Sequence, residues 1–258
     1  MQNSLIKIGE HVFEIKNHLA KPMKILSINN THNDSNNQPD MIIQLIDSYG
    51  VPFTDYNVQV TKEPTKIIYQ RSDYLIEVDS GYKEATLFVH DELALKHALM
   101  NLYSSFINYH NWGLLVHSSC VIEKGTAHIF SGQSGAGKST AAKLSHPREL
   151  LSDEASIIKI TDQKVTVYNS PFNSELDSCN LPSARLGSIQ LLHQSLQNRR
   201  DRISKSDAFL HLIDKVFYWE HSEEETRRIL QKLQHLVSSV PVYNLHFQKN
   251  NSFWELIS

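Results

Sequence analysis

Three of the chain's nine glycines, Gly132, Gly135 and Gly137, lie close together in the pattern Gly-x-x-x-x-Gly-Lys-Ser. Glycine tolerates positive φ angles and leaves its backbone N–H accessible, and wrapping a chain of phosphates requires both properties. Lys138 adds a positive charge for the phosphates, and the hydroxyl of Ser139 suits Mg²⁺. The pattern predicts a site for a nucleoside triphosphate such as ATP with Mg²⁺, formed by Gly132, Ser134, Gly135, Ala136, Gly137, Lys138, Ser139 and Thr140.

Two adjacent acids, Asp153 and Glu154, follow an apolar segment fifteen residues after Lys138. If this segment is a strand beside the strand that leads into the glycine pattern, both carboxylates reach the phosphates. One carboxylate could then hold Mg²⁺, and the other could accept a proton from an attacking hydroxyl. The alternative is that both are solvated acids in a turn.

His117 and Arg185 are weaker candidates for contacts with phosphate. His117 follows apolar residues 113–116 and precedes a hairpin that leads into the glycine pattern, so it could lie near the phosphates. A buried structural histidine explains this position equally well. Arg185 could stabilise negative charge on a transferred phosphoryl group, and the alternative is a solvated loop residue.

The elements around these residues indicate an α/β domain over residues 113–258. Lys124-Gly125 separates two apolar strands and predicts a hairpin, and a helix over about 140–145 follows the glycine pattern. Further strands are expected at 149–152, 156–160, 165–168, 189–192 and 241–247. Ser204 and Ser222 each precede acidic residues and an apolar helical stripe, as capping residues do.

Residues 1–112 are predicted to form a β-rich domain that ends in a helix. Short segments rich in β-branched and aromatic residues, at 11–15, 41–46, 66–69, 74–78 and 85–89, are typical of strands. A helix is expected from Asp91, with Leu95, Leu99, Leu102 and Phe106 on one face. The predicted fold class is therefore mixed α/β, with the chemistry in the second domain.

Composition excludes several functional classes. The chain has 258 residues, 40% of them hydrophobic, and a formal net charge of -3. It therefore lacks the excess of basic residues that is typical of nucleic-acid-binding proteins. No run of apolar residues is long enough for a membrane span. Two cysteines cannot form a disulfide framework and fit the cytoplasm, and the fourteen histidines show no metal-binding spacing.

The order of these motifs resembles the catalytic domain of HPr kinase/phosphorylase, which is akin to the phosphoenolpyruvate carboxykinase fold. The resemblance spans about residues 113–250 and is carried by HSSCV (117–121), GQSGAGKST (132–140), LSDE (151–154), YNSPF (168–172) and VPVYNL (240–245). In character the chain is most similar to the HPr-kinase-like serine kinases of lasso-peptide precursors. Members of the HPr branch form hexamers, so a homo-oligomer is compatible with the resemblance.

The resemblance implies a kinase that transfers the γ-phosphate of ATP to a serine of a peptide or protein. It implies that His117 contacts the phosphates, that Asp153 is the general base and that Glu154 helps to hold Mg²⁺. Glu154, which would help to hold the metal, stands where relatives often have Asp. Thr140 stands where the bifunctional enzymes have Glu, and no segment matches their C-terminal HPr-docking segment; these two differences point away from HPr itself as substrate. The alternatives are a kinase of a sugar or alcohol and an ATP-binding regulator without efficient transfer; GTP or pyrophosphate could replace ATP.

Overall fold

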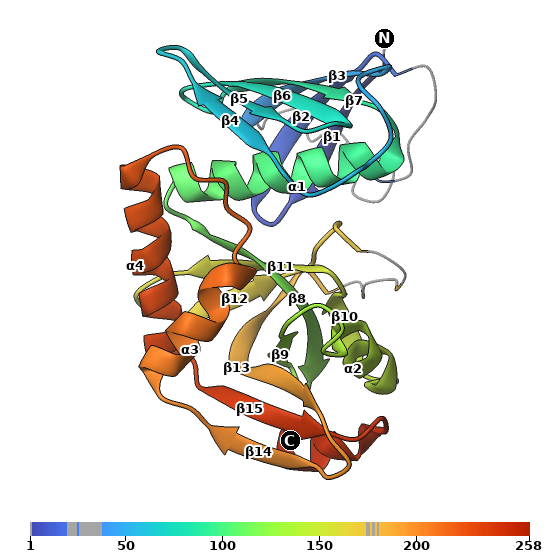
Figure 1. Ribbon diagram of the computed structural model, residues 1–258, viewed down its shortest axis with the longest axis vertical. Helices are drawn as coiled ribbons and strands as arrows, with labels where there is room; N and C mark the ends of the chain where they lie inside the picture. Colours follow the sequence, from blue (N-terminus) through green and yellow to red (C-terminus); the bar gives the residue numbers. More distant parts are fainter. Residues whose placement is uncertain (1, 20–24, 26–37, 174–175, 177–178, 180) are drawn as a thin grey trace. The chain divides into compact units, whose positions relative to one another are not determined.

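The protein is mixed α/β and consists of two compact units, as the computed structural model in Figure 1 shows. It describes residues 2–19, 25, 38–173, 176, 179 and 181–258. Unit 1 comprises Met1–Tyr109 and the distant segment Tyr218–Glu225; unit 2 comprises His110–Phe217 and Thr226–Ser258. The return of Tyr218–Glu225 to unit 1 was not expected from the sequence. Within the described ranges, no helix is long and apolar enough to cross a membrane.

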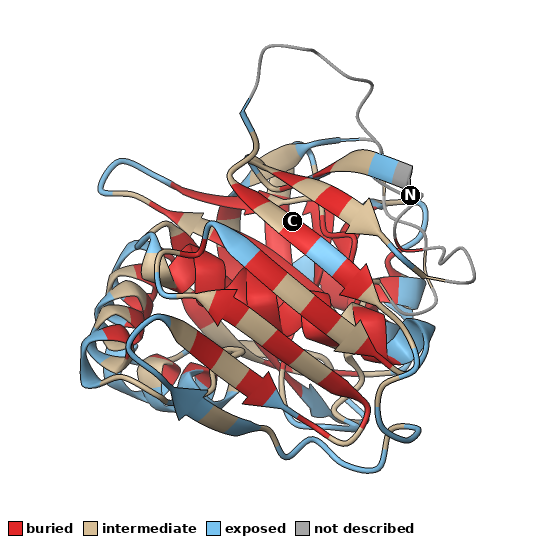
Figure 2. Ribbon diagram, turned by 90° about the horizontal axis from the view of Figure 1, so that it is seen from above, coloured by how far each residue is buried: buried red, intermediate tan, exposed pale blue. Residues whose placement is uncertain are grey.

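Unit 1 contains a seven-stranded mixed sheet in the order β1-β2-β3-β7-β6-β5-β4. β3 is parallel to both β2 and β7, and the other neighbours are antiparallel. Buried and partly exposed residues alternate along its strands, as Figure 2 shows, which is the two-residue period of a sheet with one covered face. The strands are β1 (Gln2–Ile8), β2 (His11–Asn17), β3 (Met41–Ile46), β4 (Gln59–Lys62), β5 (Lys66–Gln70), β6 (Tyr74–Asp79) and β7 (Glu84–Val89).

Helix α1 (Glu92–Tyr109) packs on this sheet, against β6 and β7. The carboxylate of Asp91 accepts a hydrogen bond from the backbone N–H of Ala94 at 2.9 Å, so it caps the first turn. Leu95, Leu99 and Phe106 of the expected apolar stripe are buried. The prediction of this helix is confirmed.

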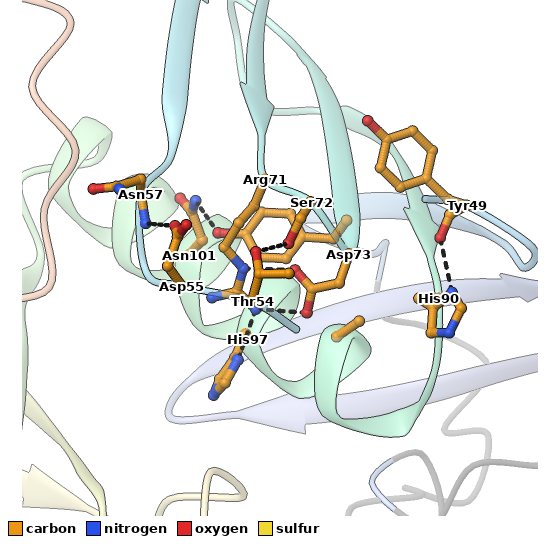
Figure 3. A network of polar contacts seen from close by, with 12 residues as sticks. Tyr49, Thr54, Asp55, Asn57, Arg71, Ser72, Asp73, His90, His97 and Asn101 are labelled. Atoms are coloured by element: carbon orange, nitrogen blue, oxygen red, sulfur yellow. Dashed lines mark hydrogen bonds and ion pairs between the residues drawn. The ribbon is translucent and has the colours of Figure 1, made fainter. Parts of the chain in front are cut away.

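A buried ion pair lies in unit 1 (Figure 3). Arg71 donates from Nε to Oδ1 of Asp73 at 2.6 Å and from Nη2 to Oδ2 at 2.9 Å. Its guanidinium lies 4.4 Å from the ring centre of Tyr74, and its Nη2 lies 2.7 Å from Nδ1 of His97. Burial and the charge of Arg71 lower the pKa of His97 to about 4, so at neutral pH this nitrogen accepts the hydrogen bond.

The segment Tyr218–Glu225 belongs to unit 1 through aromatic and polar contacts. The ring of His221 lies edge-on to the buried ring of Tyr69, with centroids 5.6 Å apart. Nε2 of His221 is 3.0 Å from a carboxylate oxygen of Glu225, whose side chain is also buried. The hydroxyl of Tyr69 is hydrogen-bonded to that of Tyr82 at 3.0 Å. The segment therefore contributes to the core of unit 1.

Unit 2 contains a second mixed sheet in which β9 and β15 run parallel to β13. The pairings β8–β11–β12–β13–β9–β8 return to their starting strand and form a closed ring. The strands are β8 (Gly113–Glu123), β9 (Thr126–Ser131), β10 (Glu149–Ser152), β11 (Ala155–Ile160), β12 (Val165–Tyr168), β13 (Ser183–Gln194), β14 (Arg199–Arg202) and β15 (Val242–Phe247). The helices are α2 (Lys138–Leu144), α3 (Lys205–Leu212) and α4 (Glu223–Ser239), of which the first three residues belong to unit 1. Two short 3-10 helices are η2 (Ile213–Lys215) and η3 (Asn251–Leu256).

The expected hairpin is formed by β8 and β9. Its turn residues Lys124 and Gly125 have φ angles of 49° and 76°, as a two-residue turn matched to the twist of the strands requires. The capping role of Ser204 is also confirmed, because its hydroxyl accepts from the N–H of Asp207 at 3.1 Å. β9 therefore leads directly from a fixed turn into the glycine-rich segment.

An apolar cluster lies behind this segment and holds α2 in place. Phe130 of β9, Ala141 of α2 and Phe247 of β15 pack in it with Trp254 of η3. The indole N–H of Trp254 donates to the hydroxyl of Ser145 at 2.9 Å, at the C-terminal end of α2. Residues far apart in sequence thus fix the helix that follows the glycines.

Candidate functional site

The glycine loop, residues 132–137, connects β9 to α2. Gly132, Gly135 and Gly137 have φ angles of 155°, 78° and 103°, values that residues with a Cβ rarely adopt. A Cβ at Gly137 would lie 2.9 Å from the ring of Phe247, whereas one at Gly135 would meet no atom within 4 Å. The loop therefore requires glycine for its backbone shape, and at Gly135 it borders open space.

Lys138 closes the loop at the start of α2. Its ammonium donates to the carbonyl oxygens of Gly132 and Gln133, at 3.1 Å each. Its own carbonyl oxygen accepts from the hydroxyl of Ser119 on β8 at 3.1 Å. Burial and the positive charge of Lys215 lower the pKa of Lys138. The loop thus holds a half-buried cation beside a second positive charge.

A cavity of about 480 Å³ opens on the loop, within the range of small-molecule sites, about 300–1,000 Å³. One side is the loop itself, and the other comes from the end of β13, from α3 and from η2. Gln194 of β13 donates from Nε2 to the carbonyl oxygen of Gly135 at 2.8 Å, which joins the two sides. The lining residues are Gly132, Gln133, Ser134, Gly135, Ala136, Leu191, Leu192, His193, Gln194, Leu210, His211, Asp214 and Lys215.

His117 lies on β8, opposite Ala155 of β11. Its ring stacks on that of Phe217, with centroids 5.8 Å apart and an angle of 13° between the planes. His117 is exposed at the surface, yet the protein packed around one side of its ring and the charges of Lys138 and Lys215 lower its pKa to about 4. The imidazole is therefore neutral at pH 7 and lies near both lysines.

Asp153 and Glu154 form the turn between β10 and β11. Asp153 is buried, with 3% of its surface exposed, and its Oδ2 accepts from the backbone N–H of Leu176 at 3.1 Å. The backbone N–H of Asp153 donates to Oδ1 of Asn173 at 3.2 Å. These contacts orient the Asp153 carboxylate, while the side chain of Glu154 is half-buried.

The acidic turn reaches the glycine loop across β8. The sequence left open whether β10 pairs beside the strand that leads into the loop; it pairs with β8, which separates it from β9. Ser118 of β8 donates its N–H to the carbonyl oxygen of Glu154 at 3.1 Å and faces Ser131 at the end of β9. Neighbouring strands lie about 4.8 Å apart, so the acidic turn and the start of the glycine loop are about 10 Å apart across β8.

The remaining predicted residues divide into two groups. Ser139 is exposed and Thr140 half-buried in the first turn of α2, directly after the loop. Arg185, in contrast, pairs with Thr126 at the beginning of β9, whereas the loop follows the end of that strand. At about 3.3 Å per residue, roughly 17 Å of strand separates Arg185 from the loop, so Arg185 is not among the residues that the fold brings to the site.

Lys215 and Gln194 are site residues that the sequence analysis missed. Lys215 follows Lys138 by 77 residues and lies in an ordinary segment, Ile-Asp-Lys-Val-Phe. Gln194 ends a strand whose apolar residues were recognised, but its own type carries no signal. Only the pairing of β13 with β9 and the packing of η2 bring them to the cavity.

Within the described residues, no group of three or more His, Cys, Asp or Glu side chains is placed to hold a metal ion. Mg²⁺ bound with a nucleotide needs only one or two protein ligands, because phosphates and water complete its shell. The donor set available here, the hydroxyl of Ser139 and the carboxylate of Glu154, fits that kind of shared site.

Comparison with protein families matches residues 90–258 to the family described as SynChlorMet cassette protein ScmC. The match covers well over half of the chain. The chain belongs to this family. The matched segment contains α1 and all the residues placed at the site, whereas β1–β7 lie outside it. A search of curated proteins finds no match.

Proposed function

We propose that the protein is an ATP- and Mg²⁺-dependent kinase that transfers the γ-phosphate to a hydroxyl, with a serine of a peptide or protein as the acceptor. The observation that carries the proposal is that β8 lies between β9 and β10. The glycine loop with Lys138 follows β9 on one side of β8, and the Asp153–Glu154 turn follows β10 on the other side. Phosphate-binding and proton-accepting groups would thereby be held on either side of the same strand, as transfer between two bound substrates requires.

The glycine loop and Lys138 would bind the phosphates. Positive-φ glycines allow the backbone N–H groups to approach an anion closely, and Lys138 supplies a charge within the loop. Neutral His117 offers a hydrogen bond at the edge of the same region. Ser139 and Glu154 would hold Mg²⁺, which supplies charge neutralisation on the phosphates.

Asp153 would act as the general base. Its carboxylate is held by Leu176, as a base must be positioned before it can act. During transfer, the acceptor oxygen would form a bond to the γ-phosphorus while the bond to the β,γ-bridging oxygen breaks. The hydroxyl proton would pass to the Asp153 carboxylate, and ADP would leave with the electron pair of the broken bond.

The resemblance to HPr kinase supports this assignment and extends it. We propose that unit 2 is an HPr-kinase-like domain of the phosphoenolpyruvate carboxykinase type and that unit 1 is an additional β-rich domain. The hairpin β8–β9 that feeds the glycine loop and the acidic turn beside His117 agree with that likeness. Thr140 and the lack of a match to the HPr-docking segment favour a precursor peptide over HPr as the substrate.

The test is transfer of radiolabelled γ-phosphate from ATP with Mg²⁺ to a panel of serine-containing peptides and of small alcohols. Asp153→Asn should lose at least about 10²-fold of the transfer rate and keep its affinity for ATP. Asp162→Asn is the matched control, because Asp162 is fully exposed in unit 2. Transfer by Asp153→Asn within a few-fold of the wild type would refute the role of Asp153.

The acceptor panel and Lys138→Ala separate the alternatives. Label on alcohols alone would identify a small-molecule kinase, and tight ATP binding without label on any acceptor would favour a regulator. Lys138→Ala should greatly weaken ATP binding, and unchanged affinity would overturn the assignment of the loop.

A further inference from the structure

Lys215 lies at the end of η2, and the residues after it run along β8. Val216 forms a β-bridge with Val116, and the backbone N–H of Phe217 donates to the carbonyl oxygen of Leu115 at 2.9 Å. These contacts fix the chain on either side of the peptide that follows Lys215. The position of Lys215 is therefore set by the strand that carries His117.

The side chain of Lys215 points into the site already described. It lines the same cavity as the glycine loop, and only 13% of its surface is exposed. Its charge lowers the pKa of both His117 and Lys138, so its ammonium is close to both. Two lysine charges that act on the same region repel each other, and an anion bound between them would remove that cost.

The ion pair of Lys215 with Asp214 does not account for this arrangement. The Asp214 side chain is 64% exposed, and exposed pairs contribute at most about 1 kcal/mol. An ammonium has three donors, so a contact with Asp214 leaves donors for a ligand. Asp214 also borders the cavity and can exchange its contact for water when an anion arrives.

The position of Lys215 relative to the acidic turn indicates which phosphate it would meet. His117 faces Ala155, the residue directly after Glu154. Lys215 precedes Val216, which forms its bridge with Val116, the neighbour of His117. The phosphoryl group that is transferred must lie toward Asp153, because the acceptor hydroxyl is deprotonated there. Lys215 is thus on the side of the loop where the terminal phosphoryl group would lie.

We propose that Lys215 is a second phosphate-binding lysine that contacts the terminal phosphoryl group of the bound triphosphate from the wall opposite Lys138. This inference rests on the proposed function and assigns it a specificity determinant. It makes the site prefer a triphosphate over a diphosphate, because ADP lacks the group that Lys215 would contact. It also places a positive charge where negative charge develops during transfer.

Binding of two nucleotides tests the proposal. The dissociation constants of ADP and of a non-hydrolysable ATP analogue, each with Mg²⁺, are measured by calorimetry for the wild type, Lys215→Ala, Lys215→Arg and Lys205→Ala. Lys215→Ala should weaken the analogue at least tenfold and ADP less than threefold, and Lys215→Arg should restore part of the loss. Lys205, exposed at the start of α3, serves as the control and should change neither constant.

Two results would overturn the inference: unchanged affinity of Lys215→Ala for the analogue, or equal losses for both nucleotides. Lys138→Ala separates this failure from that of the proposed function. If the wild type binds both nucleotides and Lys138→Ala loses both, the nucleotide site stands and Lys215→Ala alone decides the inference. If the wild type binds neither nucleotide, the proposed function fails and the inference fails with it.

A titration of His117 by NMR gives a second readout that requires no nucleotide. Removing the Lys215 charge should raise the pKa of His117, because a positive neighbour disfavours the protonated ring. Lys205→Ala should leave that titration unchanged. If Lys215→Ala also leaves it unchanged, Lys215 does not face the phosphate region and the proposal is wrong.

Discussion

Alanine at Gly135 and at Gly125 provides a matched pair that separates backbone strain from ligand binding. The two glycines have φ angles of 78° and 76°, and a Cβ at either would meet no atom within 4 Å. Alanine in the left-handed region costs about 1–2 kcal/mol, and the reduced entropy of the unfolded chain offsets about 0.4–1 kcal/mol. Each variant should therefore lose about 1 kcal/mol of unfolding free energy, or about 2–4 °C in Tm.

Only Gly135→Ala should lower the affinity for ATP. Gly135 borders the cavity, whereas Gly125 lies in the hairpin turn at the opposite end of β9. On the proposed function, a methyl group on the loop would keep phosphate oxygens from approaching the backbone N–H groups. We expect a loss of at least about tenfold in ATP affinity, or about 1.4 kcal/mol.

Thermal unfolding and calorimetric titration with ATP and Mg²⁺ check both parts of this prediction. Equal Tm shifts with a loss of affinity confined to Gly135→Ala would support the phosphate-binding role of the loop. The reasoning is refuted if Gly135→Ala binds ATP as tightly as the wild type, or if both variants lose affinity equally.

Two further predictions concern stability. His128 is buried, and its burial and the charge of Arg200 lower its pKa to about 4. The pKa of histidine in the unfolded chain is higher, about 6.5. The free energy of unfolding should therefore decrease as pH falls from 6.5 towards 4. Denaturant unfolding at pH 7 and pH 5 should show a drop smaller by about 2 kcal/mol in His128→Asn, and an equal drop would contradict the assignment. Asp73→Ala should lower the free energy of unfolding by about 3–5 kcal/mol, because it leaves Arg71 buried without its partner. The double variant with Arg71→Met should recover part of this loss. A loss below about 1 kcal/mol in Asp73→Ala would show that the pair is not buried in solution.

Sequence patterns predicted the elements that bury one face and missed the polar edges. The stripe of α1 and the turn of the β8–β9 hairpin are local features, and both were recognised. β1 and β4 were not predicted. β4 is a largely exposed strand at one edge of the sheet, and β1 is the strand at the opposite edge. An edge strand pairs on one side only, so weaker apolar alternation is sufficient to hold it.

The candidate site was predicted only where it is local in sequence. The glycine loop with Lys138 is one continuous motif and was read directly. The relation between the loop and the acidic turn depends on β8 lying between β9 and β10, and Arg185 lies far from the loop because β13 runs parallel to β9. Strand order and direction come from pairings between distant segments, which no local pattern contains. Lys215 was missed for the same reason.

The return of Tyr218–Glu225 to unit 1 determines how the protein can be divided experimentally. The chain passes between the units after residues 109, 217 and 225, so no single cut separates them. A fragment that begins at residue 110 would carry this segment without Tyr69, its aromatic partner. Because the segment begins three residues after Lys215, the fragment would also have a loose aromatic and acidic segment next to a residue that lines the cavity. Isolating unit 2 would require a short engineered linker in place of residues 218–225, in addition to the N-terminal deletion.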